Sequence, residues 1–326
     1  MNKKLLALAV GAAIAMPVAA LAEGPTLYGQ IDVSLDNMDN GTTDTWTIED
    51  NASRLGVKGS AETGVDGLKG IYVAEFGLNA DDGDADNAAG NDPITQRNIY
   101  VGLAGNFGAV LMGNLDTPTK SVQGKVDQFN DTAADISAYV AGELRAPNVL
   151  AYATPKIADS LTATVALWQS EAAGDGIGEA ISASVVYEQD ALYLGLGMDM
   201  EVPSTGGVAV TAAPTLNDIT RVVAGYTTDT LEIGFMYQMA EETVAANEDT
   251  TMLLGGAFKS GDLKVKLQYG QTEGDTAGVT NTETMLAVGA DYNVGKATTA
   301  YGLLAINEDD AGLENQTLSL GIKQKF

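Results

Sequence analysis

Residues 231–239 read LEIGFMYQM, and this stretch decides the fold. Its odd positions, from Leu231 through Phe235 to Met239, are large and apolar, whereas polar or small residues such as Glu232 fill most of the even positions. Successive side chains of a β-strand point to opposite faces, so this alternation predicts a strand with one apolar face. The same pattern recurs in residues 180–188, 192–200 and 263–269.

The links between such strands alternate between short and long. Short links are predicted near residues 64–67, 106–108, 156–160, 189–190, 228–230, 260–261 and 293–296. Long polar links are predicted near residues 38–44, 80–93, 116–147, 171–178, 201–217, 241–249, 273–281 and 308–314. A soluble β-sandwich shows the same apolar alternation, but strict alternation of link length is typical of a membrane barrel with short periplasmic turns and long external loops. Seven short and eight long links join sixteen strands, so we predict an all-β fold: a 16-stranded antiparallel transmembrane β-barrel. A barrel of that width holds a water-filled lumen.

The N-terminus predicts export. Lys3 and Lys4 precede an apolar run, and residues 20–22 (Ala-Leu-Ala) have the small-x-small form of a cleavage site. We therefore expect residues 1–22 to be a cleaved signal peptide and residues 23–326 to be the barrel domain. An uncleaved membrane anchor is the alternative, but the run is short and Pro17 interrupts it.

Composition excludes several functions. The chain contains no cysteine and no histidine, which excludes disulfides, thiolate metal sites and Ser-His or Cys-His catalysis. The net charge of -27, which loss of Lys3 and Lys4 takes to -29, argues against nucleic-acid binding. We expect no enzyme activity and no cofactor. Residues 82–86 begin like a calcium loop, but Asn87 and Pro93 stand where Gly and Glu are needed. Weak binding of divalent cations at such acidic external loops stays open, including bridging to lipopolysaccharide phosphates.

Five motifs in order resemble the Gram-negative general porin family. They are TLYG at residues 26–29, SRLGVKG at 53–59, RNIYVGL followed by GNFG at 97–108, RAPNVLAY at 145–152, and the terminal Phe326. The resemblance covers the chain after its leader. It implies a homotrimer in the outer membrane of a Gram-negative bacterium, in contact with lipid and lipopolysaccharide. It also implies that Phe326 serves as an assembly signal for the barrel-assembly machinery.

The resemblance further implies that the third external loop, here residues 116–147, folds into the lumen and forms the constriction. A long loop can also stay exposed, although long loops are often functional. Arg54, Arg97 and Arg145 match the family's basic wall cluster. The wall position after Tyr-Gly, often Lys in such porins, is Gln30, and the Arg that commonly follows Gly113 is Asn114.

The loop offers acids that would face this basic wall, namely Asp127, Asp131 and Asp135. Opposed charges across a narrow pore create a transverse field that biases ion passage. The same arginines can also brace the wall through salt bridges, and both interpretations can hold together. Charged residues inside a membrane barrel belong in the lumen rather than against lipid.

We therefore predict a pore for passive diffusion of small hydrophilic solutes and ions, with a cation preference. A solute-specific uptake channel, for sugars or anions, is the alternative. A sugar channel should show a track of aromatic residues, and the chain has only Trp46 and Trp168 as tryptophans. An outer-membrane enzyme and a purely structural barrel are further alternatives; the first lacks histidine, and the second needs no long constricting loop.

Overall fold

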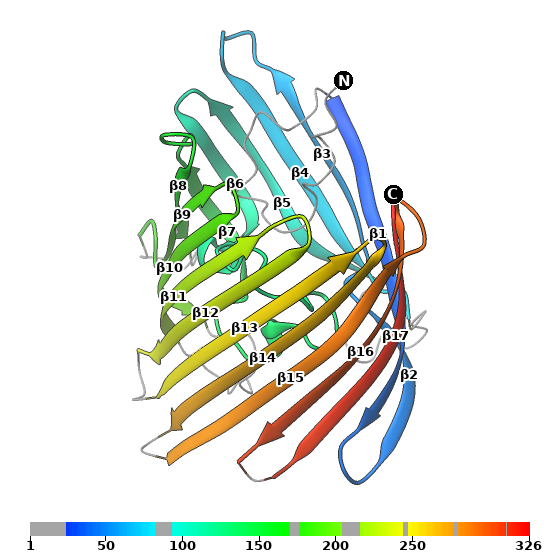
Figure 1. Cartoon of the computed structure of the whole chain (residues 1–326). Coiled ribbons are helices and arrows are strands. Elements are labelled where there is room, and N and C mark those ends of the chain that lie inside the picture. Colours follow the sequence, from blue (N-terminus) through cyan, green and yellow to red (C-terminus); the bar gives the residue numbers. More distant parts are fainter. Residues whose placement is uncertain are drawn as a thin grey trace.

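The computed structural model describes residues 24–81, 93–169, 176–203, 216–243, 247–276, 279–310 and 312–326. The expected signal peptide and the acidic stretch 82–86 lie outside these residues. Figure 1 shows the described chain as a tilted barrel, with the beginning of its first strand and the C-terminus toward the same rim.

The described residues form seventeen strand segments. They are β1 (Gly24–Asp39), β2 (Asp44–Asp50), β3 (Arg54–Glu62), β4 (Lys69–Leu78), β5 (Ile94–Gly105), β6 (Gly108–Asp116), β7 (Arg145–Ala153), β8 (Leu161–Trp168), β9 (Ala180–Gln189), β10 (Leu192–Pro203), β11 (Leu216–Thr227), β12 (Leu231–Glu242), β13 (Glu248–Ser260), β14 (Leu263–Thr276), β15 (Val279–Asn293), β16 (Thr298–Asp309) and β17 (Glu314–Lys325).

Apart from β2 and β3, segments that follow each other in sequence pair antiparallel. β2 and β3 both pair with β1, on successive stretches of it, so they form one strand interrupted at residues 51–53. β17 pairs with β1 and closes the barrel. The predicted closed barrel of sixteen strands is confirmed, and closure leaves no unpaired edge.

The two faces of the wall carry the predicted chemistry. Phe235 pairs in register with Ala224 and Leu254, and Phe235 and Leu254 are 40% and 55% exposed on the outer face. On the inner face of the same strand, Gln238 is buried. Met236 breaks the polar pattern of that face, because it is fully buried in an apolar cluster inside the barrel. On β12, apolar side chains therefore face outward, and polar or small side chains face inward except at Met236.

The seven predicted short links coincide with the turns between strands, but the predicted long link at residues 273–281 is wrong. β14 continues to Thr276 and β15 begins at Val279. Glu273 pairs with Thr282, so the polar residues of this stretch continue the ladder. Backbone hydrogen bonds can hold a hairpin together even where neither face is apolar. A prediction of strand ends from the polarity of the residues therefore places them too early. The link at 241–249 is shortened in the same way, because β12 ends at Glu242 and β13 begins at Glu248.

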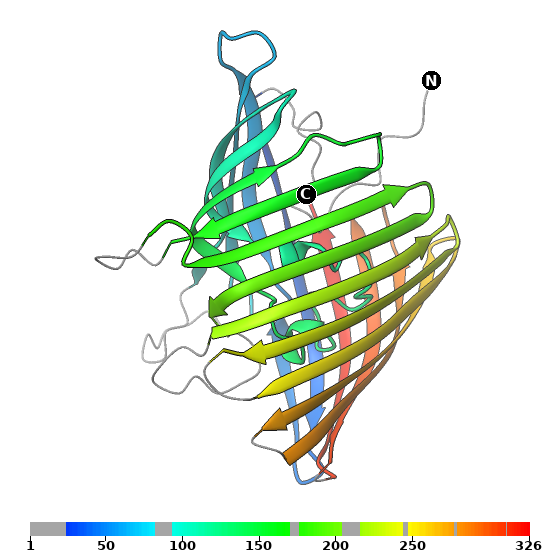
Figure 2. The ribbon, with the colours of Figure 1, turned by 90° about the vertical axis from the view of Figure 1, so that its left-hand side faces the viewer.

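The link between β6 and β7 lies inside the barrel, as Figures 1 and 2 show. It contains one short helix, α1 (Pro118–Ser121), and one 3-10 turn, η2 (Ile136–Ala138). We call residues 117–144 the inner loop. Its inward folding confirms the expectation for residues 116–147. Among the described residues, no helix is long and apolar enough to cross a membrane.

Candidate pore constriction

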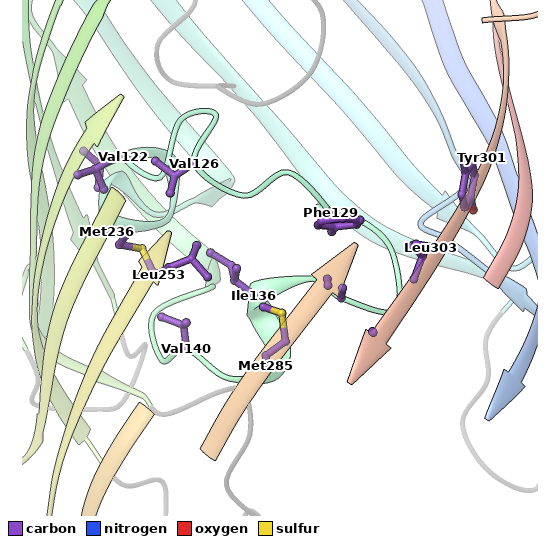
Figure 3. Close-up of a cluster of buried hydrophobic side chains, with 14 residues drawn as sticks. Val122, Val126, Phe129, Ile136, Val140, Met236, Leu253, Met285, Tyr301 and Leu303 are labelled. Carbon is purple, nitrogen blue, oxygen red and sulfur yellow. The ribbon is translucent and has the colours of Figure 1, made fainter. Parts of the chain in front are cut away.

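The inner loop lies against one side of the barrel wall. Its apolar side chains, among them Val122, Phe129 and Ile136, are buried in a cluster with inward residues of β11 to β16. Figure 3 shows Met236, Leu253, Met285 and Leu303 on those strands beside the loop. Burial of this apolar surface stabilises the docked loop. The loop therefore narrows the water column from this side.

Glycines on the wall allow the loop to come close. A Cβ atom added to Gly255 would lie 2.3 Å from the carbonyl oxygen of Val126, and one added to Gly234 would lie 2.8 Å from its Cα. Both glycines occupy inward positions of neighbouring strands. Any side chain there would displace the loop backbone, so these positions require glycine for a close approach.

Arg54 is the predicted wall arginine that the structure brings to the loop. Its Nη1 lies 3.0 Å from Oδ2 of Asp131. The same Nη1 donates to the carbonyl oxygen of Ala52 at 3.3 Å. Gln30 lies beside Arg54 in register on β1, and its amide donates to the same carbonyl at 3.4 Å. Gln30 therefore occupies the predicted wall position without adding a charge.

Arg97 is held along the wall rather than by the loop. Its Nε donates to Oε1 of Glu75 at 2.7 Å, and the Tyr28 hydroxyl donates to the other carboxylate oxygen at 2.9 Å. Asn114 donates to the carbonyl oxygen of Arg97 at 2.8 Å, so it supports the arginine backbone. The charge of Arg97 is compensated by a neighbour on β4.

Arg145 is also paired on the wall. Its Nη2 lies 2.9 Å from Oδ1 of Asp116, its register partner on β6. Lys120 of the inner loop lies 3.5 Å from the same oxygen. Asn98 joins this group, since its amide nitrogen donates to Asp116 at 2.7 Å. Two cations and one carboxylate thus meet where the loop leaves the wall.

Asp127 and Asp135 hold the loop's own turns together. Asp127 accepts hydrogen bonds from the backbone nitrogens of Phe129 at 2.8 Å and Ile136 at 3.2 Å. Asp135 accepts from the backbone nitrogens of Asp131 at 2.6 Å and Ser137 at 2.7 Å. Burial, aided by the charge of Asp135, raises the pKa of Asp127 to about 8. Of the three predicted loop acids, Asp131 is thus the one paired with a wall arginine.

Sequence reasoning missed the acids that compensate Arg97 and Arg145, namely Glu75 and Asp116. Each is a charged residue at an inward position of a strand, which is the signal that could have identified it. It also missed Arg221 and Glu143, which form a buried ion pair at 2.6 Å between β11 and the loop.

Charges are distributed unevenly along the barrel axis. Toward the rim where the C-terminus lies, three inward lysines have acidic partners: Lys264 lies 2.8 Å from Glu232, Lys266 2.8 Å from Asp291, and Lys323 2.8 Å from Asp32. Toward the opposite rim, strand alternation places a set of acids on the inner face. This set, the loop-side acids, comprises Glu242, Asp249, Glu283 and Asp309. The sequence contains no Lys or Arg in residues 222–258, 267–295 or 297–322, which supply these strand ends.

Comparison with known proteins places the chain among outer-membrane channels. A family model described as Gram-negative porin matches residues 7–312. Outer membrane porin protein 32 of Delftia acidovorans is 28% identical over 349 residues, which cover 100% of this chain and 93% of that protein.

Two solved structures share the fold. The structure of an anion-selective porin from Comamonas acidovorans superposes with a TM-score of 0.77 and 23% identity, covering 93% of this chain and 99% of the other. The trimer form of in-vitro folded OmpT of Vibrio cholerae superposes with a TM-score of 0.73 and 16% identity, covering 94% and 100%.

Proposed function

This chain belongs to the Gram-negative porin family and forms an outer-membrane channel for passive diffusion, and we propose that its pore is weakly selective for cations. The observation that carries the preference is the contrast in charge pairing. Arg54, Arg97 and Arg145 each have a carboxylate within 3.0 Å. The loop-side acids lie in segments whose sequence supplies no basic residue.

Paired charges attract mobile ions weakly, because their fields cancel at a distance, whereas uncompensated charges of one sign concentrate counter-ions. The loop-side acids therefore raise the cation concentration at one mouth of the pore. The constriction remains polar and admits solutes by size and charge.

Reversal potentials across a planar bilayer with a KCl gradient test this proposal. We expect a potential whose sign reports K⁺ moving faster than Cl⁻. A matched variant that neutralises Glu242, Asp249 and Glu283 as amides should move the potential toward zero. An anion-selective potential in the unmodified protein would contradict the preference.

A channel for anions is the second candidate, because the three arginines would line the proposed constriction and one structural neighbour is an anion-selective porin. Uptake of phosphate and of uncharged sugars of similar size into protein-containing vesicles separates the two. Faster phosphate entry would favour the anion channel, whereas entry ordered by size alone favours general diffusion.

We propose that the chain assembles as a homotrimer, as the trimer form of the Vibrio structure does. The apolar outer faces of the strands would then contact lipid, lipopolysaccharide or a neighbouring copy. The mass of the detergent-solubilised complex tests the assembly, and a monomeric mass would contradict it.

We propose further that residues 1–22 are removed on export and that Phe326 is read by the barrel-assembly machinery. Phe326 lies where the last strand meets β1: its backbone nitrogen donates to the carbonyl oxygen of Gly29 at 3.1 Å, and its carbonyl oxygen accepts from the backbone nitrogen of Gly29 at 3.1 Å. Intact mass tests cleavage, which should leave Glu23 first. Phe326→Ala should lower the yield of folded barrel in cells; an unchanged yield would contradict the assembly role.

A further inference from the structure

We infer that Arg221 of β11 positions the inner loop and thereby sets the dimensions of the pore. Its side chain is fully buried, at 0% exposure. Nη1 donates to Oε1 of Glu143 at 2.6 Å and to the carbonyl oxygen of Thr119 at 3.2 Å. Nη2 donates to the carbonyl oxygen of Ala141 at 3.0 Å, and Nε donates to Gln238 at 2.7 Å. One guanidinium therefore binds three loop residues and one wall residue.

The three loop partners come from the two ends of the inner loop. Thr119 lies near its start, whereas Ala141 and Glu143 lie near its end. Arg221 thus joins both roots of the loop at a single point and shortens the segment that is free to move. A loop whose two ends are held together has fewer conformations when its middle leaves the wall, so that release is less favourable. Gln238 reinforces the point, since its amide donates to the carbonyl oxygen of Ala141 at 2.9 Å.

The charges at this point make the arginine necessary. Glu143 is 3% exposed and Asp199, on neighbouring β10, is 2% exposed. The guanidinium contacts Glu143 directly. Arg221 Nη2 and Asp199 Oδ2 each lie 3.7 Å from a Cβ atom built on Gly142, so these two atoms are at most twice that distance apart. Without Arg221, the buried carboxylates of Glu143 and Asp199 would lose their compensating charge. The end of the loop that carries Glu143 would then move out into water, where the carboxylate is solvated.

The planar fork of arginine suits this set of partners better than an ammonium group. Donors pointing in fixed directions reach a carboxylate, two carbonyl oxygens and an amide oxygen at once. Lysine offers the charge but only one donor atom. Arg221→Lys should therefore retain part of the positioning, and Arg221→Gln should lose most of it.

Movement of the loop ends held by Arg221 would change the position of the loop at the candidate constriction. The inner loop runs from this point along the apolar cluster to Asp131, which binds Arg54. A released root would let Asp131 move relative to the wall arginines. Arg221 does not touch the permeating solute; it acts through the loop, and we class it as a positioning residue.

Single-channel recording of the full-length protein tests the inference. In Arg221→Gln, closing events should be at least about tenfold more frequent, the factor expected for loss of one charged hydrogen bond. Arg221→Lys should give an intermediate frequency. Lys69→Gln, which removes a cation from an exposed pair with Glu62 at the turn end of β4, is the matched control and should behave as the unmodified channel.

A reversible staple separates positioning from a general loss of stability. The Cβ of Val126 lies 3.1 Å from a Cβ built on Gly234, a few tenths of an ångström below the usual disulfide range. The chain has no cysteine, so Val126→Cys with Gly234→Cys gives one defined bond. A side chain at Gly234 itself displaces the loop backbone, so the same cysteine pair with Arg221 intact, oxidised and reduced, is the reference for each comparison. In Arg221→Gln, the oxidised staple should restore quiet channels, and reduction should bring the closures back. A weakened barrel would not respond to the staple in this way.

Two results would overturn the inference. The first is unmodified conductance and closing frequency in both Arg221→Gln and Arg221→Lys. The second is a formed staple that leaves the closures of an Arg221 variant unchanged. If Arg221→Gln yields no folded barrel, the same comparison is made in Arg221→Lys with and without the staple.

Discussion

Asp131 Oδ2 lies 3.0 Å from Arg54 Nη1, and this ion pair fastens the inner loop to β3. The two side chains are 14% and 9% exposed. Asp131 adopts a backbone φ of 64°, which residues other than glycine rarely take, and Asp135 stabilises this turn by accepting its backbone N–H at 2.6 Å. Asp135 therefore orients Asp131 toward Arg54, although Asp135 itself does not pair with a wall arginine.

Replacing Arg54 by Ala should make the pore more selective for cations. The change leaves Asp131 uncompensated in the constriction. A unit charge about 7 Å from an ion in water is worth roughly 0.6 kcal/mol, close to RT. It favours K⁺ and disfavours Cl⁻ by that amount, so the K⁺/Cl⁻ permeability ratio should rise about sevenfold. Reversal potentials measure this ratio.

The double variant Arg54→Ala with Asp131→Asn is the control, because it removes both charges. It should return the ratio to that of the unmodified protein. A ratio that is unchanged in Arg54→Ala alone would exclude the pair from ion selection.

Replacing Gly255 by Ala should loosen the inner loop. The new Cβ would overlap the carbonyl oxygen of Val126 at 2.3 Å, and a backbone atom cannot yield without moving the loop. We expect noisier channels with an altered conductance. Gly256→Ala is the adjacent control, since its Cβ would meet the nearest atom at an ordinary 3.5 Å. Equal recordings from the two variants would show that close packing at Val126 does not fix the loop.

The strands were predictable because a half-buried sheet imposes a period of two on the sequence. Even the exception at Met236 has a cause: the inward face becomes apolar where the inner loop covers it. The ends of β14 and β15 were not predictable from polarity, because the pairing of Glu273 with Thr282 continues the ladder where the apolar face has ended.

The candidate constriction was only partly predictable. The arginines lie on strands, where alternation and motif fix their face. The loop acids have no such period, and their roles depend on local turns: Asp127 and Asp135 bind nearby backbone nitrogens, as short acidic side chains in loops often do. The role of Arg221 was not predictable from the sequence. The strand pattern places its side chain on the inner face, but it does not show whether that side chain faces water or is covered by a loop 80 residues away in the sequence.

The inner loop should be most firmly docked in acid. Burial beside Asp135 raises the pKa of Asp127 to about 8, against about 3.9 for an exposed aspartate. Burial also raises the pKa of Glu143, despite Arg221. The docked loop therefore binds protons more tightly than a released loop. Its extra stability is complete below about pH 4 and is lost as the pH rises through about 8.

Closing events should accordingly be more frequent at pH 8.5 than at pH 5.5 in single-channel records. Asp127→Asn cannot titrate at this position, so its closing frequency should change less between the two pH values. A frequency that falls as the pH rises in the unmodified protein would reverse the sign and contradict the coupling.

A lysine should be tolerated on the lumen face of β8 and not on its lipid face. Val165 is 38% exposed on the outer face and pairs with Ala183, whereas Thr164 pairs with Ser184 on the inner face. A lysine facing the middle of the bilayer costs about 2–4 kcal/mol. Val165→Lys should therefore lower the free energy of unfolding in urea by about that amount, and Thr164→Lys, at the same depth, should change it little. The folded fraction in lipid vesicles, followed by the heat-dependent shift in gel mobility, measures both. Equal destabilisation of the two variants would mean that strand alternation in β8 does not separate a lipid face from a water-filled one.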